Sequence, residues 1–450
     1  MTLIKSISGI RGIIGTSLNL DIIKKYVSAF SKISPKGTIV LAQDSRNSGK
    51  EFINHSSAIL NQLNRKSINC GIIPTPTAQL LIEKDEYAGG IVFTASHNPK
   101  NWNGMKFINS DGIFINHQEF DLLEMKANKT YTNEYTIDND MEDCSELSIN
   151  THINNILNLE IINKDVIRSQ KIKVAIDCAN GATSKALPLL LKKLNCNVTS
   201  INSNFNEDFG RGAEPIPENL NDLSQLVINS NSDIGFATDP DGDRLSIVDN
   251  NGKPLGEELT LSLAVYYFLE YFPNVREHPI VTNLSTTKLI NYITKKYKTH
   301  LIRSSVGEIN VVDEMIKNNS LLGGEGNGGV IYKHCHLGRD SLVGTAIILN
   351  LLVNKQDTIS NIRNNLPYYF IEKSKISLPS RGFDLSKIVK TNFQNEKIID
   401  VDGFKIEFKN GNWIHIRKSN TEPIIRIIAE GESKNSAMNL IKKIKKILDE

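Results

Sequence analysis

Three stretches of this 450-residue sequence repeat one order of signals: a short β-branched run, a polar loop, a helix-like stretch and a second apolar run. The first runs of the three stretches are Thr38–Ala42, Lys173–Asp177 and Pro279–Asn283. Strands that alternate with helices in this way predict βαβ units and largely parallel sheets. Because the three stretches are well separated, we expect three similar α/β domains with mixed or parallel sheets.

The last part of the chain has a different pattern. Asn410-Gly411 stands between two alternating runs, which is a strong signal for a tight hairpin turn, and residues 432–448 have the pattern of an amphipathic helix. We therefore expect a smaller α+β C-terminal domain, with all four domains arranged around a central cleft. The expected domain limits are 1–140, 150–250, 251–363 and 367–450.

Composition and charge restrict the partners of the chain. The formal net charge is +2, with no concentrated basic face, so we expect no nucleic-acid partner. The longest apolar run, residues 346–353, is far too short to cross a membrane. Five scattered cysteines without a CxxC pair fit a reducing compartment. We expect a cytoplasmic protein, either a monomer or a homodimer, that acts on a small molecule.

The first motif, here called the serine loop (residues 94–99), reads Thr94-Ala-Ser-His-Asn-Pro99 and comes directly after an apolar run. A serine beyond the end of a buried strand is well placed for attack, and His97 could position a phosphate or move protons. The alternative is a simple turn in which Ser96 and Asn98 bond only the backbone. Taken alone, this motif favours the simple turn.

The second motif, the aspartate loop (residues 239–244), also follows an apolar run. Asp239, Asp241 and Asp243 occupy alternate positions, so in an extended loop they converge on one side. Three close negative charges need a cation, and oxygen ligands suit Mg²⁺. A calcium EF-hand is excluded because Arg244 stands where glycine is needed and Asn250 where glutamate is needed.

The third motif, the sugar loop (residues 323–329), carries Glu325 and Asn327 among five glycines. A strand-like run follows it, so a dinucleotide site, which needs a helix there, is rejected. Polar side chains on a glycine-rich loop suit hydrogen bonds to sugar hydroxyls, and the alternative is a tight hairpin. The nearby His334-Cys335-His336 suggests zinc, but without a second ligand pair the sequence favours a stretch that binds no metal.

The fourth motif, the phosphate loop (residues 417–426), has an arginine at each end and a Ser-Asn-Thr turn between them: Arg417, Ser419, Asn420, Thr421 and Arg426. Arginine forks match phosphate oxygens, and hydroxyls with loop N–H groups complete a phosphate cradle. The alternative is a charged hairpin connection. Taken alone, the motif does not decide between the two.

In this order, over essentially the whole chain, the four motifs resemble those of the phosphohexomutase family. The corresponding family patterns are TASHNP, DxDxDR, GEx(S/N)G and RxSxTEPxxR, found here at 94–99, 239–244, 324–328 and 417–426. The stretches 5–12, 323–329 and His336-Leu-Gly-Arg-Asp340 are most similar to bacterial phosphoglucosamine mutases. The resemblance implies a phosphoserine enzyme with a phosphosugar substrate.

The resemblance also assigns roles to individual residues. It implies that Ser96 carries the phosphoryl group, that its phosphate is a further ligand of Mg²⁺, and that Lys106, with His97, serves proton transfer. The expected metal ligands are Ser96, Asp239, Asp241 and Asp243. The expected substrate-binding residues are Arg11, Arg244, Glu325, Asn327, Arg417, Ser419, Asn420, Thr421 and Arg426. Val306-Gly307, with Glu308 and Asn310, matches a loop that contributes to substrate selection.

The expected reaction interconverts glucosamine 6-phosphate and glucosamine 1-phosphate through a 1,6-bisphosphate, which also serves as the activator. Such a reaction would feed UDP-N-acetylglucosamine and cell-wall synthesis. Three alternatives remain open: the same chemistry on glucose or mannose phosphates, a phosphatase with Asp239 as nucleophile, and a non-catalytic sensor of sugar phosphates.

Overall fold

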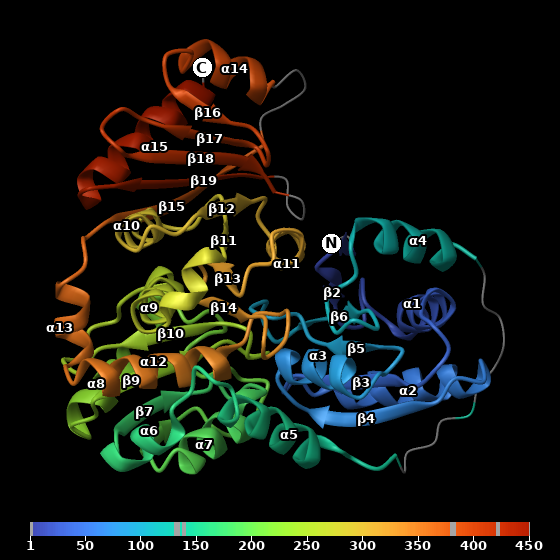
Figure 1. Cartoon of the computed structure of the whole chain (residues 1–450). Coiled ribbons are helices and arrows are strands. Elements are labelled where there is room, and N and C mark those ends of the chain that lie inside the picture. Colours follow the sequence, from blue (N-terminus) through green and yellow to red (C-terminus); the bar gives the residue numbers. More distant parts are fainter. Residues whose placement is uncertain (1–2, 130–135, 137–140, 379–383, 420–423, 450) are drawn as a thin grey trace.

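The computed structural model of the chain describes residues 3–129, 136, 141–378, 384–419 and 424–449. Four sheets, each with its own helices, follow one another along the chain (Figure 1). Three of them share one plan and the fourth is antiparallel, so the expectation of three similar α/β domains and a smaller α+β domain is confirmed. We call the units around the successive sheets domains I to IV.

Domain I contains a six-stranded sheet in the order β1-β2-β6-β5-β3-β4. Its strands are β1 (Ile4–Ser6), β2 (Gly9–Ile13), β3 (Ile39–Gln43), β4 (Ser67–Ile72), β5 (Gly89–Phe93) and β6 (Trp102–Ile108). Its helices are α1 (Leu20–Ile33), α2 (Ser48–Gln62), α3 (Thr75–Lys84) and α4 (His117–Ala127). Strands β3, β4 and β5 are parallel, and β6 returns antiparallel to β5.

Domains II and III each contain a four-stranded sheet, in the orders β10-β9-β7-β8 and β12-β11-β13-β14. The strands of domain II are β7 (Lys173–Asp177), β8 (Asn197–Ile201), β9 (Ile234–Thr238) and β10 (Leu245–Val248). Its helices are α5 (Ser145–Leu157), α6 (Lys164–Gln170), α7 (Thr183–Lys193) and α8 (Asn221–Asn229). The strands of domain III are β11 (Ile280–Asn283), β12 (Leu301–Ser304), β13 (Leu322–Glu325) and β14 (Gly329–Tyr332). Its helices are α9 (Glu257–Tyr271), α10 (Leu289–Lys296), α11 (Glu308–Lys317), α12 (Ser341–Lys355) and α13 (Ile359–Asn364).

The shared plan places three polar loops at equivalent points. In each of the first three domains, a central strand pairs parallel with the first strand of the βαβ unit: β5 with β3, β9 with β7, and β13 with β11. The same central strand pairs antiparallel with the next strand in the chain, which is β6, β10 or β14. The serine loop, the aspartate loop and the sugar loop are these three connections. Each therefore begins at the carboxyl end of a central strand, where ligand sites of α/β sheets form.

The first three domains share an apolar core, whereas domain IV has its own. Helices α9 and α12 are apolar on nearly every side, and such helices need burial all round. They pack against each other, and one continuous apolar cluster extends from Val40 in domain I to Leu366 at the end of domain III. A separate cluster fills domain IV. No helix in the described parts of the chain is long and apolar enough to span a bilayer.

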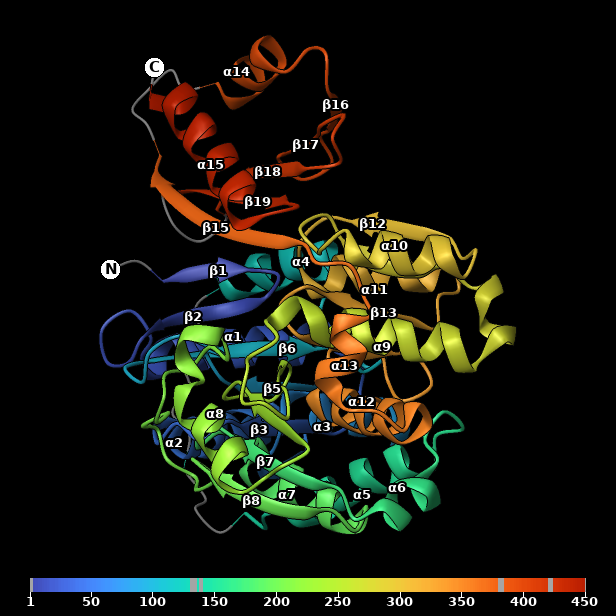
Figure 2. The same cartoon turned by 90° about the vertical axis from the view of Figure 1, so that its left-hand side faces the viewer.

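Domain IV is an antiparallel sheet in the order β15-β19-β18-β17-β16, with two helices (Figures 1 and 2). Its elements are β15 (Phe370–Ser377), α14 (Leu385–Asn392), β16 (Lys397–Ile399), β17 (Phe404–Glu407), β18 (Trp413–Lys418), β19 (Ile424–Gly431) and α15 (Lys434–Asp449). The predicted Asn410-Gly411 turn joins β17 to β18, with Gly411 at a φ of +79°. The domain lies against the β11, β12 and α10 side of domain III.

Candidate active site

The serine loop is held in place by a buried arginine. Ser96 itself is buried and has a φ of +49°, a backbone conformation that non-glycine residues keep only where the surroundings determine it. Its N–H donates to Thr94 Oγ1 at 2.8 Å, and Arg46 Nη2 donates to the carbonyls of Ser96 and Asn98 at 3.0 and 2.6 Å. The loop geometry therefore depends on groups outside the loop.

Sequence reasoning assigned no role to Arg46 or to its partner Asp44. Both side chains are fully buried and paired with each other, and Thr94 Oγ1 donates to Asp44 Oδ2 at 2.6 Å. Burial raises the pKa of Asp44, and the charge of Arg46 opposes this. The sequence offered one signal for this pair. Asp44 and Arg46 follow β3 directly, and because β3 and β5 are neighbouring parallel strands, the residues after both strands lie at the same edge of the sheet.

The aspartate loop meets the serine loop. Asp239, Asp241 and Asp243 are 0–1% exposed, and their carboxylates lie within 4.8 Å of one another, as the alternate spacing predicts. Ser96 Oγ donates to Asp239 Oδ2 at 3.3 Å. Gly242, between the last two aspartates, has a φ of +72°, which allows the chain to turn there. The fold thus places the predicted nucleophile directly on the acidic cluster.

The three aspartates differ in electrostatic environment. Lys106 Nζ donates to Asp241 Oδ2 at 2.6 Å and to Asp243 Oδ2 at 3.1 Å. Burial would raise the pKa of both carboxyls, but Lys106 lowers that of Asp241, while Arg339 and Lys106 hold that of Asp243 far below its usual range. Burial and the charges of Asp243 and Asp241 raise the pKa of Asp239 well above its usual value. The charge of Arg244, whose Nε lies 3.8 Å from Asp239 Oδ2, opposes this rise only in part.

The aspartate loop fits a divalent cation. Oδ1 of Asp241 and Oδ1 of Asp243 are buried and have no hydrogen-bond partner among the described residues. Buried polar atoms are normally paired, so two carboxylate oxygens without hydrogen bonds in a cluster of three buried carboxylates fit a bound cation. Oxygen donors of this kind are those that hard cations prefer. The loop is a buried acidic site suited to a metal ion.

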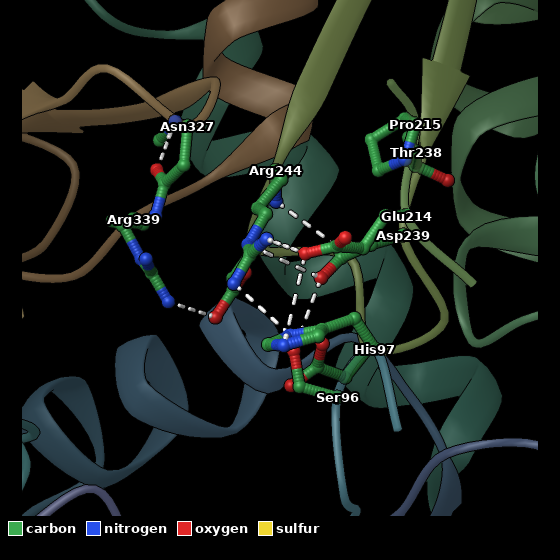
Figure 3. A network of polar contacts seen from close by, with 12 residues as sticks. Ser96, His97, Glu214, Pro215, Thr238, Asp239, Arg244, Asn327 and Arg339 are labelled. Atoms are coloured by element: carbon green, nitrogen blue, oxygen red, sulfur yellow. Dashed lines mark hydrogen bonds and ion pairs between the residues drawn. The ribbon is translucent and has the colours of Figure 1, made fainter. Parts of the chain in front are cut away.

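Arg244 and His97 lie beside Ser96 and Asp239 (Figure 3). Arg244 Nη2 donates to His97 Nδ1 at 3.1 Å, and Arg244 Nη1 donates to Glu214 Oε1 at 3.3 Å. Arg11 Nη1 donates to the Asn98 side chain at 3.2 Å. Burial first, then the charges of Arg244 and Arg11, lower the pKa of His97 well below its usual value. His97 is therefore neutral at neutral pH, and Glu214 is a further site residue that sequence reasoning missed.

Glu325 of the sugar loop is already bonded within the protein. Its Oε1 accepts from Asn283 Nδ2 at 2.7 Å and from the N–H of Gly307 at 2.9 Å. Its Oε2 accepts from Arg339 Nη1 at 2.7 Å and from Asn327 Nδ2 at 3.4 Å. A sugar hydroxyl that bound Glu325 would therefore add to this set of donors or replace one of them.

Arg339 links the sugar loop to the aspartate loop. Its Nη2 donates to Asp243 at 2.6 Å, its Nε to Glu308 at 2.9 Å and its Nη1 to Glu325 at 2.7 Å. A Cβ at Gly329 would lie 2.2 Å from the Arg339 side chain, so glycine is needed there for the arginine to pass. The sequence showed Arg339 only as part of a motif, without a role.

The phosphate loop belongs to domain IV. Arg417 on β18 and Arg426 on β19 are opposite each other in the sheet, and Arg417 Nη1 lies 3.9 Å from Asp402 Oδ2. The charge of Arg426 also contributes to the lowered pKa of His97. The Ser419 N–H donates to the carbonyl of Ile424 at 2.9 Å. Asn420 and Thr421 lie outside the described residues.

The chain matches four family models in succession. They are the α/β/α domains I, II and III of phosphoglucomutase/phosphomannomutase, over residues 3–134, 150–252 and 256–370, and the C-terminal domain of the same family, over residues 384–447. The chain belongs to the phosphoglucomutase/phosphomannomutase family, whose members are α-D-phosphohexomutases. The domain limits expected from the sequence stay a prediction.

Relatives over the full length carry more than one sugar name. The chain is 31% identical to the phosphoglucosamine/phosphogalactosamine mutase of Sulfurisphaera tokodaii, over 98% of each chain. It is 30% identical to the phosphoglucomutase/phosphomannomutase of Thermococcus kodakarensis, over 98% of this chain and 97% of that one. Relatives that match this chain over nearly its full length are therefore named after different sugar substrates.

Solved structures agree in fold. A phosphoglucomutase/phosphomannomutase family protein from Burkholderia thailandensis superposes with a TM-score of 0.82 at 22% identity, over 99% of this chain and 97% of that one. The N-acetylphosphoglucosamine mutase of Aspergillus fumigatus, in complex with GlcNAc-6P and magnesium, superposes with a TM-score of 0.62 at 12% identity, over 99% and 95%. At these identities the likeness establishes the architecture alone.

Proposed function

We propose that this chain is a phosphosugar mutase that interconverts glucosamine 6-phosphate and glucosamine 1-phosphate through a phosphoserine at Ser96 and a bound 1,6-bisphosphate. The proposal rests mainly on the contact between Ser96 Oγ and the buried acidic aspartate loop. A serine whose hydroxyl lies at a cation site is placed to carry a phosphate whose oxygens complete that site. The full-length likeness to a phosphoglucosamine/phosphogalactosamine mutase supports the choice of sugar.

In this proposal the three aspartates hold Mg²⁺, which when bound would neutralise charge on the transferred phosphoryl group. Arg244 and Arg11 lie beside the serine loop and would orient the phosphate oxygens. His97 is neutral and can accept the proton of the attacking sugar hydroxyl, whereas Lys106 is protonated and can donate one. The two residues therefore suit opposite proton transfers.

Domain IV would hold the phosphate that is not being transferred. Arg417 and Arg426 form a positive pair across β18 and β19, and Ser419 follows β18 directly. We propose that they act together with Asn420 and Thr421 and that domain IV covers the bisphosphate while it reorients. Exclusion of water in this way protects the phosphoserine from hydrolysis. Glu325 and Asn327 would bind the sugar hydroxyls between the two ends.

The proposal also covers the activator, the metabolic role, the compartment and the oligomeric state of the enzyme. A hexose or glucosamine 1,6-bisphosphate would act as activator, because it can phosphorylate Ser96 in molecules that have lost the phosphate. The product would feed UDP-N-acetylglucosamine and cell-wall synthesis in the cytoplasm. The active unit would be a monomer or a homodimer.

A second candidate is the same reaction on glucose or mannose phosphates. It is favoured by one observation, the full-length likeness to a phosphoglucomutase/phosphomannomutase. The two candidates share every residue of the mechanism and differ only in the sugar held between the aspartate loop and domain IV.

A coupled assay tests both candidates. Glucosamine, glucose and mannose 6-phosphates are compared with Mg²⁺ and a 1,6-bisphosphate activator, and the highest kcat/KM is expected for glucosamine. Ser96→Ala should lower kcat by more than about 10⁴-fold, as for other residues that form a covalent intermediate. Ser110→Ala, in the same domain, is the control. Mass spectrometry should find phosphate on Ser96.

Three results would contradict the proposal in different ways. Full activity of Ser96→Ala would remove the phosphoserine mechanism. A preference for glucose or mannose phosphates would establish the second candidate. Release of inorganic phosphate without mutase product would instead support a phosphatase with Asp239 as nucleophile.

A further inference from the structure

A second buried cluster of metal-ligating side chains lies outside the aspartate loop. His152 comes from α5, and Cys335, His336 and Asp340 come from the connection between β14 and α12. All four are 0–4% exposed, and one ligand atom from each lies within 4.8 Å of the others. The sequence showed the His334-Cys335-His336 run without a second ligand pair. The fold supplies that pair as His152 and Asp340, while His334 is exposed.

The distances in this cluster are close to those of a tetrahedral site. Asp340 Oδ2 lies 2.9 Å from His152 Nε2 and 3.2 Å from His336 Nε2, and Cys335 Sγ lies 4.0 Å from His152 Nε2. Zinc bonds of about 2.0–2.3 Å place neighbouring tetrahedral ligands roughly 3.3–3.8 Å apart. Because all the ligand atoms lie within 4.8 Å of one another, shifts of up to about one ångström would bring them onto one ion.

Hydrogen bonds from residues outside the cluster orient His152, Cys335 and Asp340. Thr77 Oγ1 bonds His152 Nδ1 at 2.8 Å, and Asn155 Nδ2 donates to Cys335 Sγ at 3.3 Å. Asp340 Oδ1 caps α12 by accepting from the N–H groups of Leu342 and Val343, at 2.8 and 3.3 Å, which leaves Oδ2 for the cluster. Outer hydrogen bonds of this kind fix the orientation of metal ligands.

Charge and ligand type favour zinc over the cations suited to the aspartate loop. One thiolate, one carboxylate and two neutral imidazoles carry two negative charges. A divalent ion would neutralise them, and charges buried in a protein need such compensation. Nitrogen and sulfur ligands suit Zn²⁺, whereas Mg²⁺ prefers oxygen. A full set of four protein ligands leaves no open position for chemistry.

We propose that His152, Cys335, His336 and Asp340 bind one structural Zn²⁺. The ion would join α5 to the start of α12, and the hydrogen bond from Thr77 would extend this junction to α3. Arg339 directly precedes Asp340 and contacts Asp243, Glu308 and Glu325. The zinc would therefore hold in place the arginine that links the aspartate loop to the sugar loop. This proposal is independent of the sugar or the reaction.

Metal content and a cobalt spectrum of the full chain test the site. After incubation with Zn²⁺ and desalting, the wild type should retain about one zinc ion per chain. Replacement with Co²⁺ should give a thiolate-to-cobalt charge-transfer band. Cys335→Ser should lose the band, and Cys70→Ser, a buried cysteine outside the cluster, should keep it. Thr77→Ala should weaken zinc binding about 10–100-fold.

The outcomes separate a metal site from a hydrogen-bonded network. Absence of retained zinc and of the cobalt band in the wild type would overturn the proposal and leave a network of hydrogen bonds around Asp340. Unchanged zinc retention in Cys335→Ser would also overturn it, because the ion would then occupy another site such as the aspartate loop. If Cys335→Ser does not fold, the wild-type cobalt band and the zinc affinity of Thr77→Ala decide together, since the band requires a cysteine ligand and Thr77 contacts His152 of the cluster.

Discussion

The junction between domains I and II and the attachment of domain IV are built differently. At the junction, Lys106 of domain I pairs with Asp241 and Asp243 of domain II, and the buried pair of Arg46 and Asp44 supports the serine loop within domain I. The junction lies within domains that share one apolar core, so the serine and the aspartates cannot move apart without exposing charges and apolar surface.

Domain IV has its own apolar core, and hydrogen bonds of buried polar groups join it to domain III. Glu430 accepts from the N–H of Lys288 at 2.9 Å, Lys405 Nζ donates to the carbonyl of Leu284 at 2.7 Å, and His415 Nδ1 lies 2.8 Å from Ser285 Oγ. Such contacts can rearrange at less cost than a shared core. Under the proposed mechanism, Ser96 and the aspartate loop are therefore held in place before the substrate binds. Domain IV, which would hold the distant phosphate, can adjust to both orientations of the bisphosphate.

Among the variants that test this comparison, Asp239→Asn at the junction should have the largest effect. Loss of a cation ligand should lower kcat by about 10³-fold or more, because a bound cation contributes several kcal/mol to phosphoryl transfer. In the absence of metal the same variant should be at least as stable as the wild type, since it removes the carboxyl whose pKa is raised by burial and by its neighbours. Activity against Mg²⁺ concentration and thermal unfolding with and without Mg²⁺ measure both effects.

The matched control for this variant is Asp222→Asn, an exposed aspartate of α8. It should change neither kcat nor the rise in unfolding temperature that Mg²⁺ produces. A metal-free Asp239→Asn protein that is clearly less stable than the metal-free wild type would show that the aspartate loop needs no cation.

Arg46→Met tests the preorganisation of the serine loop. The variant leaves Asp44 buried without its partner, which typically costs 3–5 kcal/mol in the free energy of unfolding. It also removes the hydrogen bonds to the carbonyls of Ser96 and Asn98, so kcat should fall as well. Denaturant unfolding measures the loss, and the double variant with Asp44→Asn should recover part of it.

Arg168→Met is the control for the arginine. Its ion pair with Asp165 is exposed, and exposed pairs contribute less than about 1 kcal/mol. Equal losses from Arg46→Met and Arg168→Met would mean that the serine loop does not depend on the buried pair.

Acid should weaken the attachment of domain IV. Burial lowers the pKa of His415 to about 4, and the hydrogen bond that Nε2 donates to the Asp402 carbonyl opposes this lowering. An unfolded histidine binds its proton near pH 6.5, so the stabilisation from the neutral ring is complete above pH 6.5 and is lost as the pH falls toward 4. The loss should reach up to about 3 kcal/mol.

His415→Gln should remove this part of the pH dependence, and His300→Gln, at an exposed position of domain III, should keep it. Denaturant unfolding between pH 4 and 7 gives the comparison, because other groups titrate equally in all three proteins. Identical pH profiles of His415→Gln and the wild type would contradict the assignment.

The smallest expected effect is that of Arg417→Gln on substrate binding. Loss of a charged hydrogen bond to phosphate costs about 1.5–3 kcal/mol, so KM for the sugar phosphate should rise about 10–100-fold with little change in stability. Lys409→Gln, an exposed position in the same domain, should leave KM unchanged. An unchanged KM in Arg417→Gln would place the phosphate elsewhere than on domain IV.

The sequence by itself determined the fold class and the chemical loops, because both depend on local order. The β-branched runs at 38–42, 173–177 and 279–283 formed β3, β7 and β11, and the Asn410-Gly411 turn formed as predicted. The alternate spacing of the three aspartates was enough to place their carboxylates together. Local periodicity and turn chemistry fix such features without knowledge of the rest of the chain.

Only the tertiary structure decided which distant side chains meet. It showed that the serine, aspartate and sugar loops are equivalent connections of three sheets, and it revealed the roles of Arg46, Glu214 and Arg339. His152 and Asp340 are 188 positions apart in the chain and 2.9 Å apart in space. Such contacts follow from how packed domains close on one another, and no pattern of neighbouring residues encodes them.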